Sequence, residues 1–338
     1  MSITAAAFAY TTGTLESGLA RRWHWAHGSQ GESNMRLSII HETKYLYATP
    51  ADYSIQYLRL SPQSTIQQKI LTWDLDLPRP ATLFSDGFGN TSHVLVVDRP
   101  HHEICIRAHG EVEVEDSPLN LPDIGPLGPD VYMRFTALTA QDEALNRFSE
   151  AFRRQTMNNR AAGVEALMVA VREEMDYRPG VTEVGTSAAQ AFSKRAGVCQ
   201  DHAHVFVSCC RNLNIPARYV SGYLAPKNRP ASLGRPTALA SHAWAEAWIE
   251  GAGWQGFDVA NHTRAHGRHV RVAVGLDYLD ACPVRGFHRG GKVESLEVEV
   301  QVSEIAYQER IPAAKAARSP ERQQHHQRQQ QQQLQQQL

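Results

Sequence analysis

The stretch Arg195-Ala-Gly-Val-Cys-Gln-Asp-His-Ala-His204 decides how the second half of the chain folds. It sets Cys199 in front of a segment whose apolar residues recur with helical spacing until Pro216, so it predicts a helix that begins near Cys199. Free N–H groups at a helix N-terminus stabilise a thiolate and can receive the oxyanion of a tetrahedral intermediate, with Cys199 and Gln200 as candidate donors. Taken alone, the cysteine reads equally well as a small buried residue.

A second stretch, Ser241-His-Ala-Trp-Ala-Glu-Ala-Trp-Ile249, alternates strictly and predicts a strand that carries His242. After a glycine-rich turn, residues 253–258 predict a second strand that pairs with the first one antiparallel. His242 and Asp258 should then be direct or diagonal cross-strand neighbours. In that position Asp258 accepts a hydrogen bond from one ring nitrogen of His242, and the other nitrogen faces the sulfur of Cys199.

Cysteine, histidine and aspartate in this order, each at the edge of a regular element, predict the triad of a thiol enzyme that breaks or exchanges amide bonds. Cys199 is the predicted nucleophile, His242 the general acid and base, and Asp258 the orienting carboxylate. Trp244 and Trp254 are candidates for a groove wall beside the thiol, although stacking on a half-buried sheet is the commoner role of tryptophan. The sequence does not choose between water and an amine as the acceptor of the acyl group.

The sequence gives little support for a metal site or for disulfide bonds. His202, His204, Cys199 and Cys209 lie near one another on the predicted helix, but His204 points away from the others and no second ligand pair is present. The five cysteines are an odd number without a Cys-x-x-Cys pair, which argues against a disulfide framework and a structural zinc site. We therefore expect neither a metal nor another cofactor.

These stretches together resemble a known family. The segments 197–201, 215–223, 241–246 and 253–258 are similar to the core of the bacterial transglutaminase-like proteins, within the papain-like thiol superfamily. The resemblance implies an α+β fold in which the helix with the nucleophile packs on an antiparallel sheet, and it implies the same three catalytic roles. It favours a peptidase or amidase. A transglutaminase-type acyltransferase and a non-catalytic binding module on the same fold are the alternatives.

The chain departs from that family's usual pattern at two places. Val259-Ala-Asn261 stands where Pro-Thr-Asn is usual, and His202 stands where an aromatic residue is more usual. Neither change touches the triad, but both can alter the shape of a pocket and therefore the choice of substrate.

Five regions follow from the changes of pattern along the chain. Residues 1–34 show no sustained period and are expected to be a disordered extension, with Met35 as the candidate true start. The other four regions are a β-rich N-terminal domain (35–116), a proline-rich linker (117–130), the catalytic domain (131–310) and a glutamine-rich disordered tail (311–338). The β-rich domain also resembles the N-terminal region of the same family.

Two loops have open interpretations. Asp86-Gly-Phe-Gly-Asn90 predicts a tight turn between strands rather than a binding loop, because its glycines supply the positive φ that such a turn requires. The proline-rich and glycine-containing segment 226–236 leads into His242 and either walls the substrate cleft or lies on the surface.

The amino-acid composition of the chain narrows the classes of molecule that we expect it to bind. The chain has 338 residues, about two domains in length, with 34 basic and 35 acidic residues and a formal net charge of -1, so nucleic acid is not expected as a partner. It contains no apolar run of the roughly 18 residues that a membrane span requires, and its start lacks the pattern of a signal peptide, so we expect a cytoplasmic protein that does not enter membranes. The expected partner is a protein or peptide substrate, and the oligomeric state is left open.

Overall fold

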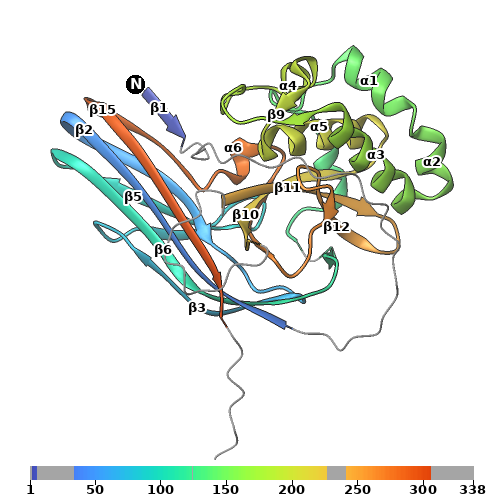
Figure 1. Ribbon diagram of the computed structural model, residues 1–338. Coiled ribbons are helices and arrows are strands. Elements are labelled where there is room, and N and C mark those ends of the chain that lie inside the picture. The colour runs from blue at the N-terminus through green and yellow to red at the C-terminus, as the bar shows by residue number, and fades with distance from the viewer. Residues whose placement is uncertain (1, 6–33, 124, 227–240, 306–338) are drawn as a thin grey trace, which may run out of the picture. The chain divides into compact units, whose positions relative to one another are not determined.

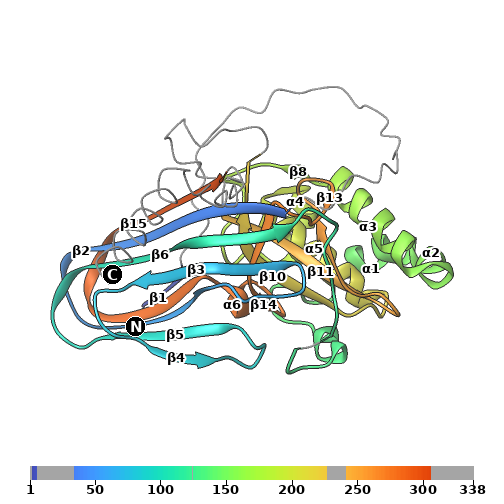
Figure 2. The same cartoon turned by 90° about the horizontal axis from the view of Figure 1, so that it is seen from below.

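The first sheet combines the N-terminal strands with the last strand of the described chain (Figures 1 and 2). The computed structural model describes residues 2–5, 34–123, 125–226 and 241–305. In them, seven strands form this sheet: β1 (Ser2–Ala5), β2 (Asn34–Ser61), β3 (Gln68–Asp76), β4 (Thr82–Ser85), β5 (Thr91–Val97), β6 (His101–Glu115) and β15 (Val284–Glu304). The order of neighbours is β1-β15-β2-β5-β4, and β6 pairs with both β2 and β3.

Strand β2 is longer than the sequence indicates. The alternating pattern predicts two strands because Pro50 interrupts it, whereas the structure keeps one strand of 28 residues. A shift of register between Leu46 and Ala51 in the pairing with β6 takes up the proline. Inward-facing residues of β2 and β6, among them Tyr45, Leu58 and Ile104, form the core of this sheet.

The ends of the described chain complete the first sheet. Residues 284–304 fall within the predicted catalytic domain (131–310), but in the structure β15 pairs with β2 from Leu58 to Leu37. The expectation of disorder in residues 1–34 fails for Ser2–Ala5, which pair with β15 as β1. Alternation is a local signal, so it does not reveal which distant strand a segment pairs with. The remainder of residues 1–33 and the tail 311–338 lie outside the described residues.

The second sheet carries the helices on one side (Figure 1). Its six strands are β7 (Asn120–Leu121), β10 (Ala217–Leu224), β11 (Ser241–Ile249), β12 (Gly253–Asp258), β13 (Thr263–Arg264) and β14 (His269–Gly275), with β13-β12-β11-β10-β14 as the order and β7 beside β12. The helices are α1 (Glu143–Glu150), α2 (Arg153–Asn158), α3 (Arg160–Glu174), α4 (Ala188–Lys194), α5 (Cys199–Asn212) and α6 (Tyr278–Ala281), together with the 3₁₀ helix η1 (Pro129–Met133) and the short parallel pair β8 (Asp176–Tyr177) and β9 (Ala196–Gly197). Helix α5 lies against β10 and β11, and α1, α3 and α4 pack around it. The predicted α+β fold, with the nucleophile's helix on an antiparallel sheet, is confirmed.

Helix α5 is buried from Cys199 to Arg211, and its buried residues include polar as well as apolar side chains. Its one buried cation, Arg211, donates to the carbonyl groups of Tyr132 (2.8 Å), Ala217 (2.9 Å) and Leu276 (2.7 Å). Its Nη1 also donates to the hydroxyl of Thr139 at 2.7 Å. A helix that starts at Thr139 is what the sequence pattern indicates, but Asp142 caps α1, and Thr139 instead accepts the hydrogen bond from Arg211.

Two side-chain amides from the N-terminal region bind the outer edge of β14. Gln68 accepts a hydrogen bond from the N–H of Arg271 (2.8 Å) and donates one to its carbonyl (2.9 Å). Asn90 forms the same two bonds with Val274, both at 2.8 Å. A bulge in the pairing of β14 with β10 lies between these contacts, so Arg271 and Val274 both present their backbone groups outward. We call Gln68 and Asn90 the edge clasp.

The segment Asp86–Asn90 is the predicted turn. The carboxylate of Asp86 accepts hydrogen bonds from the backbone N–H groups of Phe88 (3.0 Å) and Asn90 (2.9 Å), and Gly89 has the expected positive φ of 82°. The turn therefore places Asn90 for its contact with β14.

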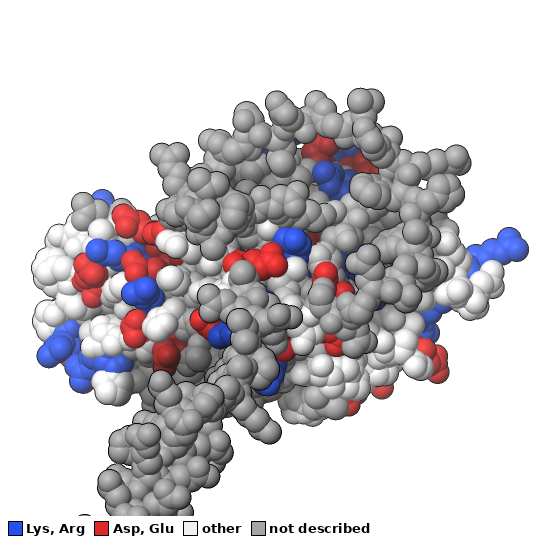
Figure 3. Space-filling model, turned by 60° about the horizontal axis from the view of Figure 1, so that its bottom comes forward, with Lys and Arg blue, Asp and Glu red and all other residues white. Residues whose placement is uncertain are grey.

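Surface charge is mixed. On the described part of the face in Figure 3, basic and acidic side chains are interspersed, as the net charge of -1 implies. Among the helices of the described residues, none is long and apolar enough to cross a bilayer.

Candidate active site

Cys199 is the first residue of α5, as its sequence context predicts. The entry into the helix is held by Asp201, whose carboxylate accepts hydrogen bonds from the N–H of Val198 (2.8 Å) and the hydroxyl of Thr182 (2.7 Å). Gly197 allows this arrangement, because a Cβ at that position would lie 2.6 Å from atoms of the Asp201 side chain. The chain thus fixes the direction in which the first N–H groups of the helix point.

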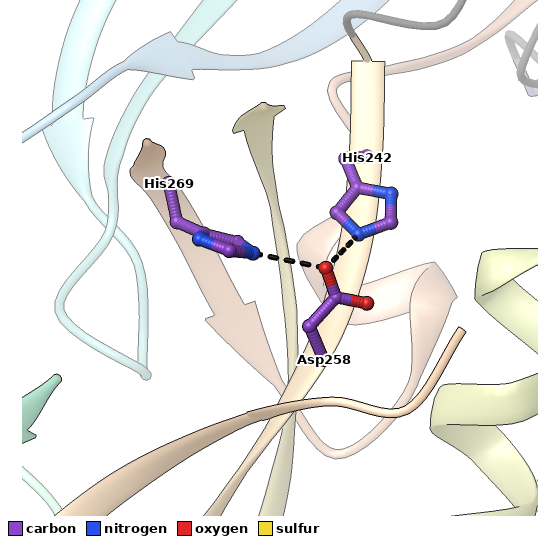
Figure 4. Close-up of side chains that lie close together, drawn as sticks. All are labelled: His242, Asp258 and His269. Carbon is purple, nitrogen blue, oxygen red and sulfur yellow. Dashed lines mark hydrogen bonds and ion pairs between the residues drawn. The ribbon is translucent and has the colours of Figure 1, made fainter. Parts of the chain in front are cut away.

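The β11–β12 hairpin brings His242 and Asp258 into contact. The register pairs Ala245 with Phe257, so Asp258 is opposite Trp244 and diagonal to His242. His242 Nε2 lies 2.8 Å from Asp258 Oδ2, as Figure 4 shows. Because a carboxylate only accepts, Nε2 carries the proton of this bond, and Nδ1 is left to face the sulfur. The predicted contact between His242 and Asp258 is confirmed, and of the two predicted positions, direct and diagonal, it is the diagonal one.

The protonation of His242 reflects its neighbours. Burial alone would lower the pKa of His242, but the charge and hydrogen bond of Asp258, followed by the hydrogen bond and charge of Cys199, raise this pKa to about 10. Burial would raise the pKa of Asp258, yet the charge of His242 and hydrogen bonds from His242 and His269 hold it well below its ordinary value. The site therefore favours an imidazolium next to an ionised carboxylate.

Two further residues donate to Asp258. His269 Nε2, from the first residue of β14, lies 2.9 Å from the same oxygen that His242 contacts (Figure 4). Asn261 donates its side-chain Nδ2 to that oxygen at 2.7 Å and its backbone N–H to Oδ1 at 3.2 Å. Asp258 is fully buried, so these bonds replace the water that its charge would otherwise require.

The side chains of His242, Asp258 and His269 lie close enough together to suggest a metal site. Ligand atoms of His242, Asp258 and His269 all lie within 4.8 Å of one another. Both imidazole nitrogens and the Asn261 amide point at one carboxylate oxygen, however, so N–H donors already occupy it. This arrangement favours a hydrogen-bonded network, and the absence of a metal from the protein stays a prediction.

The residues considered for a metal on α5 have structural partners. His202 contacts the carbonyl oxygens of Val198 (2.9 Å) and Met175 (3.2 Å) through its two ring nitrogens. His204 Nε2 accepts a hydrogen bond from the N–H of Tyr278 at 3.1 Å. These bonds explain why two polar residues are buried in the helix.

The three remaining candidate residues, Trp244, Trp254 and Gln200, lie at different distances from the triad and have different partners. Trp244 packs beside the site, with its ring stacked on His242 at 6.3 Å between centroids. Trp254 lies nearer the turn, under the guanidinium of Arg218 at 4.0 Å from its ring centroid. Gln200 uses its side-chain amide to bind the carbonyl of Val184 (3.0 Å), so only its backbone N–H is available as an oxyanion donor.

Access to the thiol is narrow. Cys199 is 3% exposed and His242 is 6% exposed. Except for Pro226, the loop 226–236 that the sequence suggests as a cleft wall lies outside the described residues.

Sequence reasoning missed His269 and the role of Asn261. His269 precedes a strand predicted from residue 270, and a histidine at a strand end carries no local signal of a distant partner. Asn261 was visible as the asparagine that this chain shares with the family's usual Pro-Thr-Asn, and its spacing of three from Asp258 suits a local side-chain to backbone contact.

Comparisons with known proteins bear on this arrangement. The chain matches the Transglutaminase-like superfamily over residues 147–259 and the Bacterial transglutaminase-like N-terminal region over residues 37–113. It is 32% identical to "Uncharacterized protein ML0607" of Mycobacterium leprae over 292 residues, which cover 80% of this chain and 99% of that protein. It is 28% identical to "Uncharacterized protein Rv2569c" of Mycobacterium tuberculosis (strain H37Rv) over 79% of this chain and 92% of that protein.

A solved structure has a similar fold. The crystal structure of a "Putative Cysteine Protease from Cytophaga hutchinsonii" superposes with a TM-score of 0.61 and 22% identity, covering 81% of this chain and 91% of that one. At this identity the likeness concerns the fold. Because the two family matches span the N-terminal sheet and the α5–β12 core, and a relative is 32% identical over nearly its whole length, this chain belongs to the bacterial transglutaminase-like family.

Proposed function

We propose that this protein is a cysteine-dependent amide hydrolase, a peptidase or amidase, that works through a thioester acyl-enzyme. The observation that carries the proposal is the buried series Asp258–His242–Cys199, in which each side chain is hydrogen-bonded to the next. A carboxylate that orients an imidazole, and an imidazole that takes the proton of a thiol, are the parts that a thiol nucleophile requires.

The residues divide the reaction between them. The thiol of Cys199 gives its proton to His242 Nδ1, and the thiolate attacks the amide carbonyl carbon. The N–H groups of Cys199 and Gln200, which belong to the first turn of α5, receive the oxyanion. His242 then protonates the leaving nitrogen, the C–N bond breaks and a thioester remains. Water, deprotonated by His242, attacks the thioester, and the thiol is re-formed.

The substrate we propose is a protein or peptide, with water as the acyl acceptor. The name of the Cytophaga hutchinsonii relative, which describes a cysteine protease, supports this choice. The family name supports the alternative, in which a primary amine accepts the acyl group. Incubation with a peptide pool, with and without an added alkylamine, separates the two, because only the second reaction incorporates the alkylamine into the product.

Thiol labelling tests the proposal without a known substrate. Cys105 on β6 is more exposed than Cys199, and burial followed by the charge of Glu42 raises the pKa of Cys105. At pH 6 we expect iodoacetamide to label Cys199 first, although exposure alone predicts Cys105. Labelling of Cys105 ahead of Cys199 would support a non-catalytic binding module.

The variant Cys199→Ser completes the test. We expect it to abolish turnover and to leave the melting temperature nearly unchanged, with Cys105→Ser as the matched control that keeps turnover. An unfolded Cys199→Ser protein would show instead that the cysteine is structural.

A further inference from the structure

We propose that His269 is a positioning residue of the candidate active site, which holds the carboxylate of Asp258 in the orientation that His242 needs. This inference rests on the proposed function and adds a fourth side chain to it. His269 lies outside the β11–β12 hairpin, at the start of β14. It is buried, and one of its nitrogens contacts Asp258 Oδ2 at 2.9 Å.

The hydrogen bonds of His269 define its tautomer. The ionised carboxylate of Asp258 only accepts, so Nε2 of His269 carries the proton of that bond. In the neutral ring, Nδ1 then accepts a hydrogen bond from the N–H of His266 at 3.1 Å, which is shorter than its 3.3 Å approach to the carbonyl oxygen of His266. His269 is therefore a donor whose direction is set by the backbone behind it, the arrangement in which an outer histidine or carboxylate orients a functional group.

The contribution of His269 differs from that of the other donors to Asp258. Asn261 lies three residues after Asp258, just beyond the end of β12, so it moves with the carboxylate that it binds. His242, on β11, is the group to be oriented. Apart from His242, His269 is the donor among the described residues that ties Asp258 to another strand, and this contact restricts rotation of the carboxylate about its own side-chain bonds.

The strand that carries His269 is itself held on both edges. Its inner edge pairs with β10, and its outer edge is bound by the edge clasp, in which Gln68 contacts Arg271, two residues beyond His269. The ring of Trp244 packs edge-on against His269, at 5.2 Å between centroids and 77° between planes. The N-terminal sheet thereby supports the alignment of the triad through β14 and His269.

The test compares two substitutions of His269 with a matched control. His269→Gln keeps one N–H donor at a similar reach, whereas His269→Leu removes the donor. The control is His41→Leu, because His41 is also a buried histidine with a side-chain partner, Tyr223 at 2.9 Å, and contacts no member of the triad. The measurement is the second-order rate of Cys199 alkylation by iodoacetamide at pH 6, followed by mass spectrometry, together with the melting temperature.

We expect His269→Leu to lower the alkylation rate about tenfold, by analogy with the roughly 10- to 100-fold effect of losing an outer hydrogen-bond partner of a metal-ligating side chain. His269→Gln should restore the rate to within about threefold of the unmodified protein, and His41→Leu should leave the rate unchanged even where it lowers the melting temperature. Equal rates for His269→Leu and the unmodified protein would overturn the inference. A low rate in both His269 variants would also overturn it, since a purely structural role predicts that result.

The same data separate this inference from the proposed function. If Cys199 of the unmodified protein reacts no faster than glutathione, the proposed function fails and the inference falls with it. If Cys199 is reactive and indifferent to His269, only the inference fails. Should His269→Leu not fold, the ¹⁵N spectrum of the unmodified protein decides, because a neutral His269 with its proton on Nδ1 would exclude the donor role.

Discussion

Replacement of Asp258 by asparagine is the sharpest single test of the site. Burial alone would lower the pKa of His242, and Asp258 supplies the largest opposing effects, which carry the pKa from its ordinary 6.5 to about 10. The difference of about 3.5 pH units corresponds to about 5 kcal/mol, or roughly 3000-fold in the ratio of imidazolium to imidazole. Asp258 also offsets the lowering by burial, and Cys199 adds to the rise, so this net figure gives the order of magnitude expected for Asp258→Asn.

The assay is the rate of Cys199 alkylation by iodoacetamide between pH 5 and pH 9. In the unmodified protein an imidazolium lies beside the thiol, so the reaction should be fast at pH 6. In Asp258→Asn we expect the rate at pH 6 to fall at least about 100-fold, because the imidazolium of His242 loses its counter-charge. Asp277→Asn, which changes a buried carboxylate that caps α6, is the control and should keep the fast rate.

The stability of the fold gives a second measurement on the same variant. Because the pKa of His242 is higher in the folded chain than its ordinary 6.5, the imidazolium–carboxylate pair contributes stability that is complete below pH 6.5 and is lost as the pH rises toward 10. The free energy of unfolding in urea should therefore decrease from pH 6 to pH 9 in the unmodified protein, and this decrease should be smaller in Asp258→Asn. The reasoning is refuted if Asp258→Asn retains both the fast alkylation at pH 6 and the full pH dependence of stability.

Three other substitutions test the surroundings of the site. Asn90→Ala should lower the free energy of unfolding in urea by about 2 kcal/mol, because it removes the hydrogen-bond partner of Val274 on the buried edge of β14. Asn34→Ala, at an exposed position, should lower it by less than about 0.5 kcal/mol. Equal effects of the two substitutions would contradict the role of the edge clasp. The buried Glu246 carboxylate pairs with the buried Arg218 at 2.6 Å and with the half-buried Arg271 at 3.0 Å. Glu246→Gln should therefore cost about 3–5 kcal/mol, whereas Glu143→Gln, from an exposed ion pair, should cost under about 0.5 kcal/mol. A small effect of Glu246→Gln would argue against a stabilising role of these two ion pairs. Gly197→Ala should slow alkylation of Cys199 about tenfold, because the added Cβ would displace the side chain of Asp201, which holds the entry into α5. An unchanged rate would show that the helix entry tolerates this displacement.

Local patterns were sufficient for the predicted triad. The start of α5 at Cys199 follows from a glycine ahead of a helical period, and the contact of His242 with Asp258 follows from alternation on both sides of a short turn. Both signals act over a few residues, where side-chain periodicity and turn chemistry determine the geometry.

The contacts that sequence reasoning did not find are long-range. The partner of His269 depends on how β14 pairs with β10 across a bulge, and the partner of β15 depends on the opposite end of the chain. Arg211 is a similar case, since it binds carbonyl groups of three separate segments. Alternation and periodicity carry no information about such pairings.

The edge clasp has a consequence for the catalytic half when it is made by itself. Removal of residues 34–116 would leave the N–H and C=O groups of Arg271 and Val274 exposed along an unpaired strand, which is a template for another copy of the same strand. A shortened protein of this kind should self-associate or precipitate. The N-terminal sheet thus protects the edge of β14 from pairing with another molecule. If evolution separated the two halves, other groups would have to replace the amide side chains of Gln68 and Asn90.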